Sequence, residues 1–432
     1  MYPCAGGLDC KAVTAQKSAL KGMRITKTYG IDFLRAKLGK KSGRVRLRYA
    51  YYEMKNKKRE ISALIPPEFR SLTYSLGWCA KAVDSLSDRL IYDGFDNDDF
   101  MLEQIYSLNN ADVLFDGSVL SSLITSCCFL YIDVTDNGYP RIECIDGGNA
   151  TGVIDSVTNM LTEGYAIIER DEYGKPLLEA YFLPYRTEYY EAGKLIDVLE
   201  HDAPHPLLVP VINRPDAKRP FGHSRISRAC MDIVQSAVRT MLRTEVAAEF
   251  FSVPQKYVVG ISQDAVFDNR KATLSSFLKF TKDDEGKSPT LGQFQQQSMA
   301  PHLDHMKMLA SMFAGETGLT LDDLGFNTGN PASYDAIRAS HEQLRLTARK
   351  AQRTFSVGFL NAGYLAACLR DKFSYDRSAF ANTKVSWQPI FEPDASALGA
   401  VGDAVYKINQ AVPDYIGTKA LRSMTGLESD AE

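Results

Sequence analysis

The sequence predicts an α+β fold, and three observations support this class. Between residues 127 and 199, short runs of β-forming residues alternate with turn signals such as Asp136-Asn137-Gly138, the pattern of an antiparallel meander. After Pro220, apolar residues recur mainly at the spacing of a helix. The chain has 432 residues, of which 45% are hydrophobic, 24% charged and 10% aromatic, enough for a folded core divided into two or three modules.

Charge is unevenly distributed, although the net charge is only −3. Residues 24–60 contain 13 Lys or Arg against 3 Asp or Glu, whereas residues 84–116 contain one Arg against nine acids. The small net charge excludes a uniformly basic nucleic-acid-binding protein, and the asymmetry indicates surfaces that meet other surfaces. The longest apolar run, 119–132, is too short to span a bilayer, so no membrane segment is predicted.

The N-terminal segment and the cysteines carry no targeting or metal-binding pattern. Residues 1–22 lack the apolar block of a secretory signal, so we expect a flexible tail or an extension from an upstream start. The eight cysteines include no CxxC pair, and several lie in apolar patterns. We expect them to be reduced thiols of an intracellular protein.

The basic segment 24–60 interleaves its cationic side chains with tyrosines, a composition that suits a nucleic-acid-binding arm. The alternative is a solvated helix that meets an acidic neighbour, such as residues 84–116 of another copy, and we favour this interpretation. Downstream, residues 69–92 are predicted to form a helix, and residues 96–108 a second helix with acids at its start.

A long amphipathic helix is predicted from residue 223 to residue 251, after a Pro-rich polar loop at 205–222. At 100° per residue, one face gathers the apolar residues Ile226, Cys230, Ile233, Val234, Ala237, Met241, Ala248 and Phe251. The roughly opposite side carries Arg225, Arg228, Arg239 and Arg243, with Asp232 among them. One face therefore needs a core, and the other suits anionic partners.

A strand–helix–strand insert is predicted after this helix. Residues 255–261 and 290–297 are expected to pair as strands around a helical centre at 267–280. A polar tip follows that centre and contains Lys282, Asp283, Asp284, Glu285 and Lys287. Residues 301–314 then have the pattern of a shorter helix. The insert should form a protrusion between the two helices.

Residues 318–331 interrupt the helical pattern with three glycines, a proline and an Asn-Pro step, so a mobile loop is predicted. The helix after it has Ser333 as a cap and is expected to bury Ile337, Leu344, Ala348, Ala351 and Phe355. A second basic stripe on this helix contains Arg338, Arg345, Arg349 and Arg353, with Glu342 inside it. A short strand around Trp387 and helices at 397–411 and 418–424 complete the chain.

Residues that imitate enzyme or metal sites lack the partners that such chemistry needs. Asp216 and Lys218 resemble part of a nuclease motif, but they lie in a Pro-broken loop without a further acid on a neighbouring strand. His302 and His305, with Asp304, share a helix face but have no evident third ligand. No phosphate-binding loop, dinucleotide fingerprint or serine nucleophile elbow occurs. We therefore expect no catalytic residue, metal or cofactor.

Three stretches, in this order, resemble the portal (head-to-tail connector) proteins of tailed bacteriophages. In the first, Asn213-Arg214 and Gly222-His223-Ser224 precede the long helix, which ends in a Phe- and Pro-containing turn and a strand. The second is PASYDAIRASHEQLRLTARKAQRTF from Pro331, and the third is the tail from Trp387 to Leu427. In order and spacing the resemblance runs from about Met23 to the C-terminus.

The resemblance implies a portal fold. Its parts would be an N-terminal tail (1–23), a wing of helices and an antiparallel meander (24–222), a first stem helix (223–251), a clip of helix and strands (252–300) and a second stem helix (301–317). A tunnel loop (318–331), a long kinked helix that returns to the wing (332–386) and a helical C-terminal crown (387–432) would follow. In such a protein the loop residues Leu319, Leu321, Asp322, Asp323, Leu324 and Phe326 would face DNA, and the clip tip at 282–287 would contact the motor and adaptor proteins. For each of these loop side chains, an equal alternative to facing DNA is that it covers a local hydrophobic core.

The resemblance also implies a function. The chain would form a ring, a dodecamer in the family, at one vertex of the capsid. The ring would be the channel for packaging and ejecting double-stranded DNA, touched transiently and without sequence preference. It would dock the terminase large subunit, then head-completion and adaptor proteins, beside the major capsid and scaffolding proteins. Its location would be the virion, and the host cytoplasm during assembly. The arginine stripes would bridge neighbouring subunits or line the channel; we favour bridging, because gripped phosphates slow sliding. A metal-dependent nuclease and a monomeric virion structural or adaptor protein are the alternatives.

Overall fold

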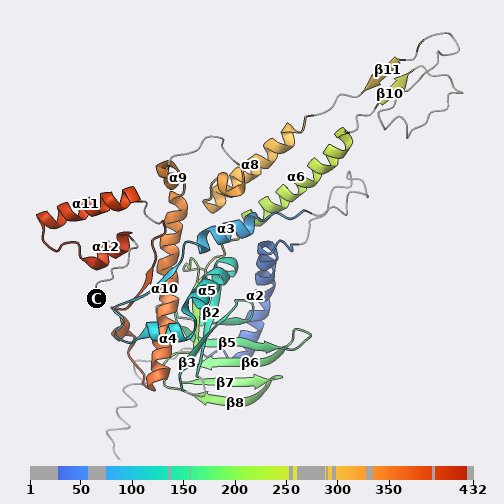
Figure 1. Cartoon of the computed structure of the whole chain (residues 1–432). Coiled ribbons are helices and arrows are strands. Elements are labelled where there is room, and N and C mark those ends of the chain that lie inside the picture. Colours follow the sequence, from blue (N-terminus) through green and yellow to red (C-terminus); the bar gives the residue numbers. More distant parts are fainter. Residues whose placement is uncertain are drawn as a thin grey trace, which may run out of the picture. The chain divides into compact units, whose positions relative to one another are not determined.

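The computed structural model describes residues 28–56, 74–134, 138–155, 157–252, 256–259, 288, 290–293, 298–326, 334–391 and 395–425. The chain has a mixed architecture of helices and antiparallel sheets (Figure 1). It divides into two compact units: unit 1 comprises Met1–Arg46, Ser87–Ser224 and Ala348–Glu432, and unit 2 comprises Leu47–Leu86 and Arg225–Thr347. The α+β class predicted from the sequence is confirmed.

Unit 1 contains two antiparallel sheets. The first has the order β3-β2-β9 and the second the order β4-β5-β6-β7-β8. Their strands are β2 (Cys127–Val134), β3 (Pro140–Ile145), β4 (Ala150–Ile154), β5 (Leu161–Arg170), β6 (Pro176–Leu183), β7 (Arg186–Glu191), β8 (Lys194–Glu200) and β9 (Leu208–Ile212). The predicted meander is therefore present but is split between two sheets.

Strand β9 contradicts the prediction of a polar loop at 205–222. All five of its residues are buried, and it pairs with β2 from Cys127↔Ile212 to Tyr131↔Leu208. Pro210, in the middle of the strand, lies at a sheet edge, where a residue without an N–H is tolerated. The prolines suggested a loop, but an edge position in a sheet accommodates them.

Helix α2 (Ile31–Tyr52) brings most of the basic segment together, and its first four turns lie in unit 1 on the second sheet. Leu34 and Leu38 pack with Tyr165, Ile167 and Tyr181 of β5 and β6. The Arg35 guanidinium donates to both carboxylate oxygens of Glu179, from Nε at 3.1 Å and from Nη2 at 2.7 Å. The acidic neighbour of this basic helix is thus, in part, a strand of its own chain.

The remaining helices of unit 1 pack through aromatic rings. They are α4 (Leu102–Leu108), α5 (Ala111–Thr125) and α10 (Glu342–Asp371), whose residues from Ala348 onward belong to this unit. Phe115 of α5 stacks on Phe359 of α10 with centroids 3.7 Å apart. The hydroxyl of Tyr106 donates to the Phe359 carbonyl oxygen at 2.6 Å. Helix α5 was not predicted from the sequence.

Two predicted helices near the acidic segment are shorter than expected. Of the helix predicted at 69–92, the structure shows α3 (Trp78–Ser87), and Tyr92 begins strand β1 (Tyr92–Asp96). Strand β1 pairs with β12 (Lys384–Trp387), nearly three hundred residues away, and local propensity cannot reveal that partner. The helix predicted at 96–108 starts only at Leu102, because the Asp98 carboxylate accepts from the N–H groups of Leu102 and Glu103.

The C-terminal helices agree with the sequence. A short 3₁₀ helix at Arg377–Phe380 precedes β12, and α11 (Ala395–Ala411) and α12 (Thr418–Thr425) follow it. The predicted ranges were 397–411 and 418–424. Asn409 links the two helices by bonding both the N–H and the carbonyl oxygen of Ile416.

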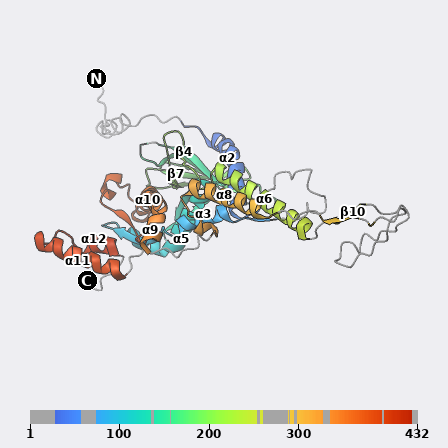
Figure 2. The ribbon, with the colours of Figure 1, turned by 90° about the horizontal axis from the view of Figure 1, so that it is seen from above.

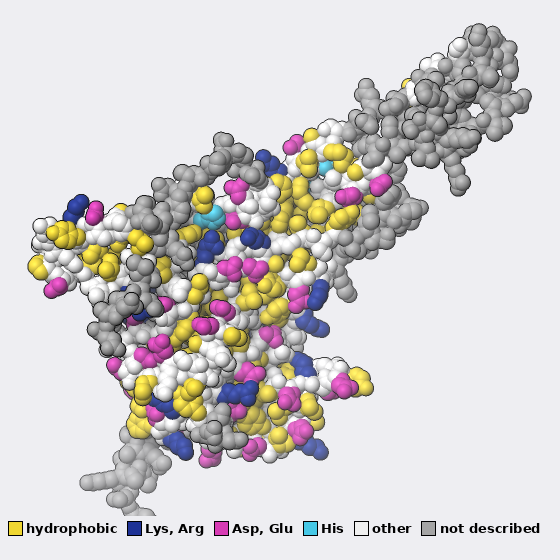
Figure 3. Space-filling view, in the orientation of Figure 1, with side chains coloured by type: hydrophobic (Ala, Val, Ile, Leu, Met, Phe, Trp, Pro, Cys, Tyr) yellow, Lys and Arg dark blue, Asp and Glu magenta, His cyan; other side chains and the backbone are white. Residues whose placement is uncertain are grey.

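Unit 2 is built on the antiparallel pair α6 (Arg228–Ser252) and α8 (Ala300–Thr317), which lie side by side in both ribbon views (Figures 1 and 2). Of the predicted buried face, Ile226, Cys230, Ile233, Val234 and Ala237 are buried. Farther along, Leu242 is buried, while Met241 and Ala248 are half-buried. Hydrophobic side chains are also visible on the surface of this pair (Figure 3), and Met308 and Met312 of α8 are exposed.

Helix α6 starts at Arg228, five residues later than predicted. The hydroxyl oxygen of Ser227 accepts from the N–H of Cys230 at 3.2 Å, and the Ser227 carbonyl accepts from Met231. Ser227 is therefore the N-cap, and Arg225 lies outside the helix.

The predicted strand pair of the insert is confirmed. Strands β10 (Lys256–Val259) and β11 (Thr290–Gln293) pair antiparallel, with Tyr257 opposite Gly292. The predicted helix at 267–280 and the polar tip at 282–287 lie outside the described residues.

The long helix after the loop is interrupted, in agreement with the kink expected there. Helix α9 (Tyr334–Ser340) ends at Ser340, and α10 starts at Glu342. Leu344, Ala348, Ala351 and Phe355 are buried as predicted, but Ile337 is 48% exposed. That prediction was wrong because the interruption at His341 ends the helical periodicity on which it depended.

Candidate functional site

The segment after α8 is a compact turn within unit 2. Gly318, with a φ of 72°, ends α8 and donates its N–H to the Ala314 carbonyl at 2.8 Å. A 3₁₀ turn, η2 (Asp322–Leu324), follows and is closed by Gly325 with a φ of 87°. Both glycines occupy the left-handed region that other residues rarely adopt. The glycines that predicted a loop therefore mark the two ends of an ordered turn.

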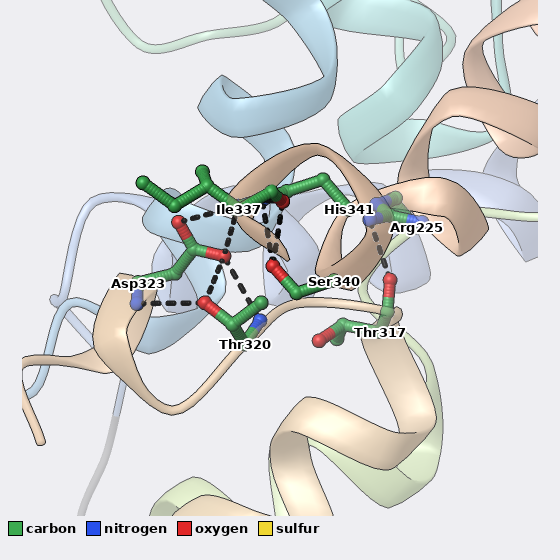
Figure 4. A network of polar contacts seen from close by, with 7 residues as sticks. All are labelled: Arg225, Thr317, Thr320, Asp323, Ile337, Ser340 and His341. Carbon is green, nitrogen blue, oxygen red and sulfur yellow. Dashed lines mark hydrogen bonds and ion pairs between the residues drawn. The ribbon is translucent and has the colours of Figure 1, made fainter. Parts of the chain in front are cut away.

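Asp323 organises this turn. Its Oδ2 accepts from both the N–H and the hydroxyl of Thr320, each at 2.9 Å, and the Thr320 oxygen accepts from the Asp323 N–H at 3.2 Å. The same Oδ2 lies 3.2 Å from Nε2 of His341, at the interruption between α9 and α10 (Figure 4). The contact thus joins the turn to the helix that follows it in sequence.

The surroundings of Asp323 favour its carboxylate form. Burial raises the pKa of Asp323, but the Thr320 hydrogen bonds and the His341 ring outweigh it, so the net pKa lies below the usual value. The Nδ1 atom of His341 lies 2.9 Å from the Ile337 carbonyl oxygen. Nε2 of His341 thus faces the Asp323 carboxylate, and Nδ1 lies near the Ile337 carbonyl oxygen and, at 3.3 Å, the Ser340 hydroxyl.

The six loop residues predicted to face DNA have different environments. Leu319 and Leu324 are only 7% and 8% exposed, as expected of side chains that cover a local core. Phe326 meets Trp78 edge-on with ring centroids 6.5 Å apart. Asp322 is exposed, Leu321 is half-buried, and Asp323 is engaged as described. Contact of these six side chains with DNA stays a prediction, and residues 327–331 lie outside the described part of the chain.

The first arginine stripe is not continuous. Arg225, which precedes α6, donates from Nε to the Ala82 carbonyl at 2.9 Å and from Nη2 to the Thr317 carbonyl at 2.7 Å. It ties the end of α8 to α3, and Figure 4 shows the Thr317 contact. Arg239 donates to the Ser236 hydroxyl at 3.2 Å. Arg228 and Arg243 are exposed on α6 and remain candidates for an external partner.

The second stripe is divided by the interruption at His341. Arg338 is exposed on α9, and Arg345 donates to both carboxylate oxygens of Glu342 at 2.7 and 2.6 Å. Arg349 and Arg353 lie in unit 1, are exposed, and have no ion pair with any residue that the structure describes. On this stripe, the exposed positive charge without an ion pair to a described residue therefore lies at Arg338, Arg349 and Arg353.

The residues considered above as parts of a nuclease or metal site instead stabilise a turn and a contact between helices. The Asp216 carboxylate accepts from the N–H groups of Lys218 and Arg219 and lies 2.6 Å from Nε2 of His223. The Nδ1 atom of His305 lies 3.0 Å from the Thr240 hydroxyl. Among the described residues, no group of three metal-ligating side chains occurs.

Two further observations concern helices and thiols. No helix in the described ranges has the length and apolar character needed to cross a membrane. The six cysteines that the structure describes are free thiols, five of them buried; Cys4 and Cys10 lie outside these ranges.

The sequence did not indicate the Arg225 brace or the Asp323–His341 pair. Asp323 and His341 are 18 positions apart, on either side of the loop. Arg225 donates to backbone carbonyl groups, and because every residue has one, the sequence does not show which of them it binds. The positive-φ glycines at either end of the turn were the available signal.

Comparison with known proteins gives two related sequences. The portal protein of Mycobacterium phage L5 is 25% identical over 324 residues, and that of Mycobacterium phage D29 is 26% identical over 325 residues. Each alignment covers 68% of this chain and 65% of the relative, so the chain spans just under two thirds of the length of the curated relatives it matches. No family model matches the chain.

Among solved structures, chains of gene transfer agent particles are similar over most of their length. A chain of the native virion has a TM-score of 0.47 at 11% identity, with 96% of this chain and 99% of that chain covered. A chain from the neck of the native particle, computed with C12 symmetry, has a TM-score of 0.46 at 12% identity, with 89% and 99% covered. The predicted likeness is confirmed by the two sequence relatives: this chain is similar in sequence to the portal proteins of these two phages.

Proposed function

We propose that the chain is a portal subunit, a structural and non-enzymatic component that assembles into a ring at one vertex of a phage capsid. The observation that carries the proposal is the sequence relationship to two phage portal proteins over about two thirds of the chain. The ring would be the passage for double-stranded DNA during packaging and ejection. It would dock a terminase motor first and head-completion proteins later.

The parts of the structure fit named roles in such a subunit. The part of unit 1 within residues 24–222, with its two sheets, would belong to the wing, and α6 with α8 would be the stem. The insert around β10 and β11 would be the clip that contacts the motor and adaptor proteins, and α11 with α12 would belong to the crown. Residues 318–331 would be the tunnel loop.

The chemistry of the loop supports weak contact with DNA. Residues 318–331 contain no Lys or Arg and two Asp, so the loop cannot neutralise phosphate charge. A protein that neutralises phosphates gains affinity for each counterion released, and such affinity would slow a sliding duplex. The loop would therefore touch DNA transiently and without sequence preference, through Leu321 and Asp322 on its more accessible side.

The arginines of the two stripes would bridge subunits rather than grip DNA. Reversing the charge of Arg239 and Arg243 tests this role. Arginines that bridge neighbouring subunits are needed for ring assembly, whereas arginines that only line the channel are not. We expect the double charge reversal to shift the ring toward monomer. A ring that persists while DNA retention changes would assign these side chains to the channel.

The decisive experiment is the native mass of the purified 48.0 kDa chain, combined with negative-stain imaging. A ring many times the mass of the chain, with an axial pore, is the expected result. A single compact particle under all assembly conditions would contradict the proposal and favour a monomeric virion structural or adaptor protein. The nuclease alternative has no support in the site, since Asp216 is held in a turn.

A further inference from the structure

Unit 1 has a surface that combines acidic and exposed apolar side chains, at the end of α4 and the start of α5. This acidic face consists of Leu108, Asp112, Val113 and Asp116. Leu108 is 64% exposed and Val113 is 75% exposed, values that are high for large apolar residues on a folded unit. Both carboxylates are exposed, and neither has an ion pair with a described residue.

The carboxylates of this face repel one another. Burial raises the pKa of Asp116, and the negative charges of Asp112 and Asp88 raise it further. No cation of the described chain offsets this repulsion at Asp112 or Asp116. A cationic partner would relieve it, and the exposed Leu108 and Val113 would gain cover at the same time.

A basic face of matching character lies on α10. It consists of Arg349, Lys350, Arg353 and Val357, all exposed, and Val357 is 39% exposed. Arg349, Arg353 and Val357 are spaced four residues apart and so follow one stripe of the helix. None of the three cations has an ion pair within the described ranges.

The two faces form no ion pair with each other within the described chain. Helix α5 packs on α10 through Phe115 and Phe359, so the side of α10 that bears Phe355 and Phe359 is turned inward. Arg353 precedes Phe355 by two positions, or about 200° around the helix, and therefore points away from α5. Both faces are therefore available to a partner from outside the chain.

We infer that the acidic face of one copy of this chain binds the basic face of the next copy. The inference rests on the proposed ring and specifies which surfaces close it. Because the two faces differ, each copy would use both at once, and the contact is the head-to-tail kind that generates a ring. Opposite charge would set the register, and the apolar side chains would be covered between the copies.

Paired charge reversal tests the inference in the full-length chain. One variant carries Asp112→Lys and Asp116→Lys, a second carries Arg349→Glu and Arg353→Glu, and a third carries all four substitutions. A control carries Glu169→Lys and Glu172→Lys, two exposed acids on another part of unit 1 with the same change in charge. Assembly is measured by native mass and sedimentation, and folding by circular dichroism and the thermal midpoint.

Each two-site variant should weaken association between copies by at least about tenfold, because like charges would then face each other. The four-site variant should recover rings, which a misfolded α5 could not do, and the control should assemble like the wild type. If the wild type forms rings and both two-site variants also form them normally, the inference is overturned while the proposed function stands. If the wild type forms no ring, the proposed function fails first. Normal rings with altered DNA retention in the Arg349→Glu, Arg353→Glu variant would assign the basic face to nucleic acid and also overturn the inference.

Discussion

Nε2 of His341 lies 3.2 Å from Oδ2 of Asp323, and this contact fastens the turn after α8 to the interruption between α9 and α10. The side chains of His341 and Asp323 are 13% and 20% exposed, so solvent screens the pair only partly. The position of the proposed tunnel loop is therefore set at its base by the contact between Asp323 and His341 and by the hydrogen bonds between Thr320 and Asp323.

Replacing Asp323 with Asn should loosen this turn. The change removes the charge and leaves an amide that cannot accept from Thr320 and His341 as the carboxylate does, so unit 2 should lose about 1–3 kcal/mol of unfolding free energy. Urea unfolding measures the loss, and limited proteolysis should show faster cleavage near residues 318–333. Asp304→Asn, at an exposed position of α8, is the matched control and should change neither readout. Equal protease resistance in the two variants would show that the turn does not depend on Asp323.

Arg225→Met should destabilise unit 2 although it keeps much of the side-chain volume. Two carbonyl oxygens, of Ala82 and Thr317, lose a charged donor, and the expected cost is about 2–4 kcal/mol. Arg228→Met, at an exposed neighbouring position, should cost less than about 0.5 kcal/mol. Thermal unfolding compares the two variants. Similar midpoints would refute the structural role of Arg225.

Ser227→Ala should weaken the start of α6. Loss of the N-cap oxygen leaves the Cys230 N–H without its acceptor, and the hydrogen bond from Ser227 to Glu316 is lost as well, for about 1 kcal/mol in total. Hydrogen exchange should accelerate first at residues 228–231. Ser311→Ala on α8 is the control, because the Ser311 hydroxyl donates to the Lys307 carbonyl oxygen of the same helix. Unchanged exchange in this first turn would contradict the N-cap assignment.

Unit 1 should become less stable as the pH falls below about 6.5, the ordinary pKa of a histidine side chain. Burial lowers the pKa of His201 to about 4, against the opposing effects of Asp202 and the Ala203 backbone. In the unfolded chain the ring titrates near its ordinary value of about 6.5, so between that pH and 4 the unfolded state binds the proton more readily. The free energy of unfolding therefore falls as the pH is lowered through this window.

The His201→Gln variant isolates this contribution, because Gln does not titrate. The wild type should lose more stability than the variant between pH 7 and pH 4, as followed by urea unfolding at each pH. His205, whose pKa burial also lowers, is present in both proteins and cancels in the comparison. Parallel stability curves for the two proteins would show that His201 does not contribute.

Periodic, locally determined features could be predicted from the sequence. The buried face of α6 from Cys230 to Ala237, the strand pair of β10 with β11 and the C-terminal helices agree with the structure, because helical period, alternation and turn residues act over a few neighbours. Strand β9 could not be predicted, since Pro210 and the prolines on either side of the strand suggest a loop until β2 supplies a partner. The buried Leu319 and Leu324 likewise look the same in sequence as the half-buried Leu321.

The sequence by itself determined the α+β class, the order of helices and strands around the loop, and the relationship to portal proteins, because these depend on residue patterns along the chain. Only the tertiary structure decided how charges are used. Arg225 and Arg345 are occupied within the chain, whereas Arg349 and Arg353 are available to a partner, although all four follow from the same basic stripes. The physical reason is that a charge is satisfied by what lies within a few ångströms in space, and residues far apart in sequence supply those neighbours.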